Sequence, residues 1–86
     1  SDVRKVERIL RQAANDHPDV LDDPAPFVFF KDFGNSSLDF EVYFWTYKAF
    51  QFEKIRSDMR FSIDDAFRKN NVEIPFPQRD IHIRTK

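Results

Sequence analysis

The side chains of this 86-residue chain that could do chemistry are two histidines, two adjacent serines and several carboxylates. His17 and His82 belong to the only residue type that titrates near neutral pH without help from its surroundings. Ser36 and Ser37 lie outside any Gly-x-Ser-x-Gly motif and have no histidine near them in sequence. Turn formation therefore explains the serine pair better than nucleophilic catalysis does.

The carboxylates form no pattern that binds a metal or supports acid–base catalysis. The loop around His17 also contains Asp16, Asp19, Asp22 and Asp23. Their spacing matches no zinc or calcium motif, so we predict solvated side chains and no metal site. Further along the chain lie Glu41, Glu53, Asp64 and Asp65. We expect these four carboxylates to face water, and we predict that the chain is not an enzyme and needs no cofactor.

The composition is that of one small globular domain. Apolar residues make up 41% and charged residues 34% of the chain, the net charge is -1, and eleven phenylalanines can fill a core. The absence of cysteine excludes disulfides and thiol chemistry. The longest apolar run, residues 25–30, is far shorter than the ~20 residues that cross a bilayer, and the first residues lack the apolar region of a signal peptide. Because the sequence does not begin with Met, we expect it to be a piece of a longer protein.

Hydrophobic spacing predicts two amphipathic helices and several strands. Apolar side chains recur every three or four positions over residues 3–14, with Asp2 as the N-cap, and again over residues 51–69, which Asn70 and Asn71 close. The other predicted elements are a loop at 15–26, a strand at 27–33, a hairpin loop at 34–37, a strand at 38–44, a short strand at 72–74 and a final strand at 80–84.

This order of elements predicts an α+β fold of the ferredoxin-like, βαββαβ type that lacks its first strand, with two helices on an antiparallel sheet. A stiff corner made by Pro75, Phe76 and Pro77 turns the last strand away from the one before it. We expect one domain over residues 1–86, with a sandwich over 1–78 and a terminal assembly strand over 79–86. The predicted core consists of Val6, Ile9, Leu10, Ala13, Phe40, Val42, Phe44, Ile55, Met59, Ile63 and Phe67.

Two groups of residues are candidates for contacts with other chains. Alternation in the last strand gives it one apolar and one polar side, and the alternation of residues 38–44 directs Tyr43 and Trp45 away from the core. The candidate interface residues are Tyr43, Trp45, Phe76, Asp80, Ile81, His82, Ile83 and Arg84.

The alternative to an assembly role is a small ferredoxin-like module that binds RNA or senses a metabolite. RNA-recognition domains display outward aromatic residues on such a sheet, as Tyr43 and Trp45 would be. The Lys/Arg-Gly-aromatic-Gly-aromatic signature is missing, however, and the chain is slightly acidic. We therefore predict no nucleic-acid partner. Binding of a metabolite would be detected as an increase in the melting temperature of the chain.

Three segments in one order resemble the carboxyl-terminal cytoplasmic domain of the small-conductance mechanosensitive ion channel family. They are the Pro- and Asp-rich loop at residues 16–26, the hairpin at residues 33–42 with Trp45 after it, and the strand, Pro-aromatic-Pro-Gln corner and strand at residues 70–86. Together they cover nearly the whole chain, which makes the resemblance far more specific than any one segment.

The resemblance implies a subunit of a homo-oligomeric channel, a heptamer at full length, in the cell inner membrane with this domain on its cytoplasmic side. It implies that the domain helps to form a cage below the pore and modulates the release of ions and osmolytes under hypoosmotic stress. Contact with the membrane would come only through helices that precede this chain. Residues 80–84 would pair with the same strand of other subunits in a parallel barrel. In this chain alone, the alternatives are that they fill the place of the missing first strand or exchange with another copy to do so.

Overall fold

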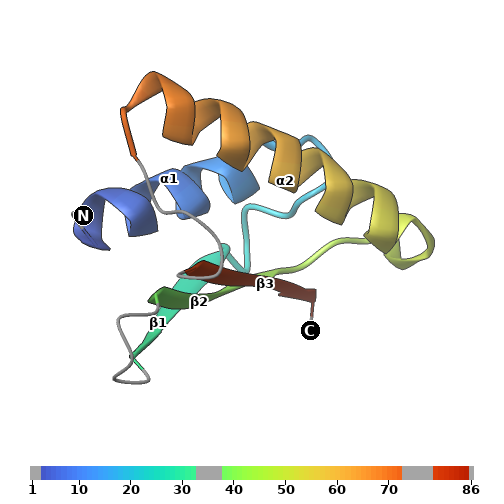
Figure 1. Cartoon of the computed structure of the whole chain (residues 1–86). Helices are drawn as coiled ribbons and strands as arrows, with labels where there is room; N and C mark the ends of the chain where they lie inside the picture. Colours follow the sequence, from blue (N-terminus) through green and yellow to red (C-terminus); the bar gives the residue numbers. More distant parts are fainter. Residues whose placement is uncertain (1–2, 33–37, 73–78, 86) are drawn as a thin grey trace.

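Two helices lie across one face of a three-stranded sheet in the computed structural model, which describes residues 3–32, 38–72 and 79–85 (Figure 1). The elements are α1 (Val3–Asp16), β1 (Phe27–Asp32), β2 (Leu38–Phe44), α2 (Phe52–Lys69) and β3 (Arg79–Thr85), with a short 3-10 turn at Ala49–Gln51 before α2. The sheet order is β1-β2-β3, in which β2 pairs with β1 antiparallel and with β3 parallel. The predicted α+β class is confirmed for the two helices and the antiparallel pair β1 and β2. The third strand departs from the predicted antiparallel sheet, because β3 runs parallel to β2.

The helix α1 forms because its apolar residues share one face. Val6, Leu10 and Ala13 recur at spacings of four and three residues and are all buried against the sheet and α2. The helix confirms the predicted start at residue 3 and continues two residues past the predicted end, through Asp16. The proposed N-cap, Asp2, lies outside the described residues.

The hairpin of β1 and β2 supplies the apolar floor under the helices. Val28 is the register partner of Val42, and Phe30 is that of Phe40. The side chains of these pairs lie on the face of the sheet that the helices cover. Phe40, Val42 and Phe44 are fully buried there, as predicted. β1 ends at Asp32, and the predicted hairpin turn at 34–37 lies outside the described residues.

The end of α2 is closed by its backbone and by an asparagine in the left-handed conformation. Asn71 has a φ of 56°, a value that asparagine tolerates better than most residues do. Its N–H donates to the carbonyl of Arg68, and the N–H of Val72 donates to the carbonyl of Phe67, the pair of bonds that defines a Schellman motif. The Lys5 ammonium reaches across from α1 to the carbonyl of Asn70, at 2.7 Å.

The last strand runs beside β2 of its own chain. Phe40 is registered with Ile81 and Val42 with Ile83, and the Ile83 side chain is buried in the common core. Of the short strand predicted at 72–74, Val72 is in irregular structure. The rest of that segment and the proline corner lie outside the described residues.

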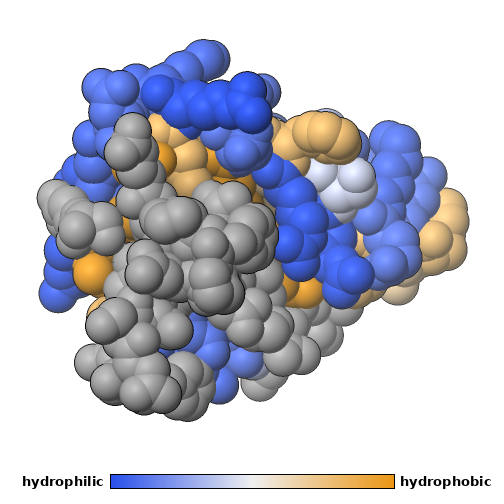
Figure 2. All heavy atoms as spheres, viewed as in Figure 1, coloured by the Kyte–Doolittle hydropathy of each residue, from blue (hydrophilic) through white to orange (hydrophobic). Residues whose placement is uncertain are grey.

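The core is close to the predicted one. All the predicted core residues are buried except Ile9, which is only partly buried at the margin. Ala14, Val20 and Ile83 join the core without having been in the predicted set. Away from the core, Tyr47 and Phe50 are exposed by 88% and 83% in the connection between β2 and α2. Figure 2 shows hydrophobic atoms at that end of the molecule, beyond hydrophilic side chains that cover much of the helix layer.

Candidate functional site

The face of the sheet opposite the helices carries four aromatic side chains in mutual contact. Phe27 and Tyr43 are register partners whose rings stack with centroids 5.0 Å apart and an interplanar angle of 8°. Phe29 meets both of these rings edge-on, and Trp45 lies 5.6 Å from Phe27. We call Phe27, Phe29, Tyr43 and Trp45 the aromatic face. α1 contacts β1 and β2 from the other side of the sheet, α2 lies on that side as well, and no described helix covers this one (Figure 1).

A buried carboxylate lies within the aromatic face, which corrects the expectation that Glu41 faces water. Glu41 alternates with the core residues of β2 and therefore lies on the aromatic face. The large side chains around it there leave it only 7% exposed. The Lys31 ammonium lies 3.2 Å from one carboxylate oxygen, and the Tyr43 hydroxyl donates to the other at 3.2 Å. A buried charge needs such partners. Because Glu41 neutralises Lys31, this pair offers no cation to a nucleic-acid backbone.

The predicted interface residues divide into those with a described environment and those without one. Tyr43 and Trp45 are half-buried members of the aromatic face, as their alternation predicts. Ile83 is buried in the core of its own chain. The backbone of β3 includes the remaining strand candidates, Asp80, Ile81, His82 and Arg84. Their side chains, and the whole of Phe76, lie outside the described residues.

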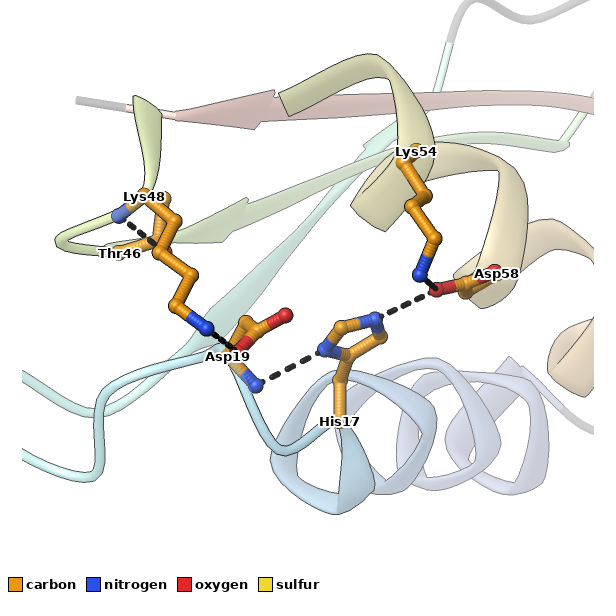
Figure 3. Close-up of polar contacts among 6 residues, drawn as sticks. All are labelled: His17, Asp19, Thr46, Lys48, Lys54 and Asp58. Carbon is orange, nitrogen blue, oxygen red and sulfur yellow. Dashed lines mark hydrogen bonds and ion pairs between the residues drawn. The ribbon is translucent and has the colours of Figure 1, made fainter. Parts of the chain in front are cut away.

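A second group of polar residues gathers where α1 ends, and Figure 3 shows its contacts. The His17 ring is buried, with 8% of its side chain exposed, and its Nε2 lies 2.9 Å from an Asp58 oxygen on α2. Its Nδ1 accepts a hydrogen bond from the Asp19 N–H at 3.0 Å. Lys54 approaches the same Asp58 oxygen at 3.8 Å, and Lys48 pairs with Asp19 at 3.1 Å. We call these five residues the His17 cluster.

These hydrogen bonds assign the tautomer of His17. A ring nitrogen that accepts a bond from a backbone N–H carries a lone pair and no proton, so Nδ1 is unprotonated. The proton of the neutral ring is then on Nε2 and is donated to the Asp58 carboxylate. This hydrogen bond, with Lys54 as a smaller contribution, holds the pKa of Asp58 below its ordinary value, while burial acts in the opposite direction.

The His17 cluster was not predicted, because its two central residues are 41 positions apart. The one local signal was the spacing of Lys54 and Asp58, which puts both on the same side of a helix. Within residues 3–32, 38–72 and 79–85, no group of three or more histidines or carboxylates is arranged to hold a metal ion. None of the helices described there has both the length and the apolar character to cross a bilayer.

Comparison with known proteins identifies relatives along the whole chain. The model of the family "Mechanosensitive ion channel MscS, C-terminal" matches residues 1–74. The chain is 34% identical over all 86 residues to "Mechanosensitive channel MscK" of Escherichia coli K12 and covers 8% of that protein. It is 28% identical over 86 residues to "Small-conductance mechanosensitive channel" of Helicobacter pylori and covers 31% of that protein. The "Large-conductance mechanosensitive channel MscMJLR" of Methanocaldococcus jannaschii is 28% identical to 95% of the chain, which spans 24% of that channel. The chain thus corresponds to less than a third of each of these relatives.

Proposed function

Since the chain belongs to the MscS family of mechanosensitive ion channels, as its C-terminal domain, we propose that it is the cytoplasmic part of a channel subunit. In this proposal the domain helps to assemble a cage below the pore and modulates the release of ions and osmolytes under hypoosmotic stress. The observation that carries the proposal is the match of the family model to residues 1–74, supported by relatives that are named as mechanosensitive channels. The family is one of channels and not of enzymes, which agrees with the sequence prediction.

The proposed place of the domain is the cytoplasmic side of the cell inner membrane. The rest of the subunit would supply the contact with the bilayer, as expected for a chain that spans only 8% to 31% of the channels described above. We propose that the partners are other copies of the same subunit, seven in the complete channel, and that no nucleic acid takes part.

Two features support the proposed contacts between subunits. The aromatic face leaves Phe29 51% exposed and presents four adjoining rings that no helix of the described residues covers, which suits burial against another chain. The strand β3 is at the edge of the sheet, so its outer side can pair with a strand of a neighbouring subunit. We accordingly keep Tyr43, Trp45, Phe76, Asp80, Ile81, His82 and Arg84 as the proposed interface. Ile83 is left out because its side chain is buried in the core of its own chain.

The arrangement also supports a ferredoxin-like sandwich without its first strand. In the complete βαββαβ unit the first strand is central, and in this chain β3 lies beside β2 and parallel to it, in the place where that strand is expected. We infer a division of labour in which residues 1–78 form the sandwich and residues 79–86 act as an assembly strand. β3 completes its own sheet in the structure of this chain, and in the complete channel it would pair with other subunits instead.

A chimeric channel tests the proposed function. Residues 1–86 would replace the matching segment of the Helicobacter pylori relative, in a bacterial strain that lacks its own mechanosensitive channels. We expect the chimera to reach the membrane, to give tension-gated currents in membrane patches and to restore survival after a hypoosmotic shock. The parent channel and the same channel truncated before the segment are the controls. A chimera that reaches the membrane in normal amounts yet gives no tension-gated current would contradict the proposal.

A further inference from the structure

The His17 ring joins three parts of the fold at one point. It follows the last residue of α1, it bonds to Asp58 on α2, and it accepts the Asp19 amide within its own turn (Figure 3). The N–H of Val20 donates to the His17 carbonyl at 3.2 Å, which closes the same turn. Because only 8% of the His17 side chain is exposed, water has little access to the two ring nitrogens, although the Asp58 carboxylate itself is 44% exposed.

Protonation affects the two hydrogen bonds of the ring in opposite ways. A charged imidazolium carries a proton on both nitrogens, so Nε2 still donates to the Asp58 carboxylate and gains an attraction between opposite charges. Nδ1, in contrast, can no longer accept the Asp19 N–H, and two N–H groups would face each other at 3.0 Å. The charged ring is therefore held by α2 and repelled by its own turn.

We propose that His17 is a pH-sensitive latch. The neutral ring fastens the turn over residues 17–21 to α2 by bonding to Asp19 and Asp58 together. Acidification protonates the ring, which keeps Asp58, releases the Asp19 amide and loosens the turn. Histidine is the side chain suited to this task, because its charge changes between about pH 5 and 8.

Charged groups from each neighbouring element surround the latch. Asp16 at the end of α1, Asp19 in the turn and Asp58 on α2 are carboxylates, which favour the charged ring. Lys54 on α2 and Lys48 from the connection between β2 and α2 oppose it, the latter through its pairing with Asp19. Ser62 is the neutral polar residue that lines the same shallow pocket.

One backbone hydrogen bond joins the turn over residues 17–21 to the end of β2. The N–H of Leu21 donates to the carbonyl of Trp45 at 2.8 Å, and Val20 is buried in the core. When the turn loosens, the position of Trp45 at the rim of the aromatic face loses this support. The latch itself does not depend on the proposed channel function, although such a movement would couple pH to any contact that the aromatic face makes.

Nuclear magnetic resonance of the chain between pH 8 and pH 5 tests the latch. At pH 8 we expect ¹⁵N shifts of the His17 ring that report a proton on Nε2 alone. On acidification we expect the protection factor of the Asp19 amide, corrected for intrinsic exchange, to fall about tenfold with the same midpoint as the ring titration, as for the loss of one ordinary hydrogen bond. The Leu21 amide should follow it. A ring that titrates without a change at Asp19, or a ring that stays neutral at pH 5, would overturn the proposal.

Two variants separate His17 from other titrating groups. In His17→Asn the side-chain oxygen can accept the Asp19 N–H in place of Nδ1 but cannot titrate, so Asp19 should be equally protected at pH 5 and pH 8. His82→Gln is the matched control, since it removes the other histidine and should leave the transition in place. Equal loss of Asp19 protection in the wild type and in His17→Asn would rule out the latch. If His17→Asn does not fold, the wild type and His82→Gln still decide the matter through the ring titration.

Discussion

At the scale of single residues, the carboxylates of Glu41 and Asp58 are each paired with a side chain from another part of the fold. Glu41 is buried among aromatic rings, and the side chains of Lys31 and Tyr43 satisfy its oxygens. Asp58 is half exposed, and its partner His17 is the buried member of the pair. Glu41 of β2 is bound by Lys31 of β1, and Asp58 of α2 is bound by His17 after α1. Each contact therefore helps to fix the position of one element relative to another.

The lowered pKa of Asp58 predicts how its contribution to stability depends on pH. A carboxyl group whose pKa is lower in the folded state than in the unfolded state stabilises the fold above its ordinary pKa of about 4, and this stabilisation is lost as the pH falls through the folded-state value. Thermal unfolding of the wild type and of Asp58→Asn should therefore differ at pH 7, with the variant melting lower, and the difference should vanish at an acid pH below the folded-state pKa of Asp58. The asparagine oxygen still accepts from His17, so the comparison isolates the charge. An equal difference in melting temperature at both pH values would contradict this assignment.

At the scale of elements, β2 connects everything else. Its inward residues lie under both helices, and its outward residues contribute Tyr43 and Glu41 to the aromatic face. The fully buried Phe44 also stacks on Phe52 at the start of α2, with ring centroids 5.7 Å apart. Packing at Phe44 thus holds the sheet to the second helix.

Truncation of Phe44 tests this packing. We expect Phe44→Ala to lower the free energy of unfolding by about 3–5 kcal/mol, as for other buried phenylalanines, because it removes a ring with no access to water. Phe61→Ala is the matched control, since Phe61 is 73% exposed on α2, and its effect should stay within about 0.5 kcal/mol. Denaturant titration of both variants gives the comparison. Equal midpoints for the two would show that Phe44 does not face the core.

The burial of apolar residues that recur at a regular spacing could be predicted from the sequence. The three- and four-residue spacing in α1 and α2 and the strict alternation in β2 determine which side of each element is apolar, so most of the core followed from the sequence. Ile9 was misjudged because it lies at the margin of the apolar stripe, where spacing alone does not decide burial. Glu41 was misjudged because its burial depends on the rings of β1 that lie opposite. The bond between His17 and Asp58 joins residues from distant segments and required the packed structure.

At the scale of the whole molecule, one face of the sheet is covered by helices and the other is aromatic. This asymmetry gives the isolated chain a surface that would bury apolar area on association. The edge strands β1 and β3 flank the same sheet, so association through the aromatic face and pairing at an edge can occur together.

A charge placed on the aromatic face tests the proposed association. In light-scattering measurements over a range of concentrations, we expect the wild-type chain to self-associate and Phe29→Asp to shift the equilibrium toward the monomer, because a carboxylate there would have to be desolvated. Phe61→Asp, which adds the same charge to the exposed side of α2, should associate like the wild type. If both variants have the same mass as the wild type at every concentration, the aromatic face does not mediate association.

The pairing of β3 with β2 also has a consequence for biosynthesis. Ile83 completes a core to which Val6 and Leu10 contribute from the other end of the sequence, so the core cannot close until residue 83 has left the ribosome. Domains generally fold as units during translation, and a nascent chain that ends before β3 leaves the edge of β2 open beside Phe40 and Val42. Between synthesis of β2 and synthesis of β3, this open edge therefore leaves the growing chain exposed to mispairing, which is the kind of state that chaperones bind.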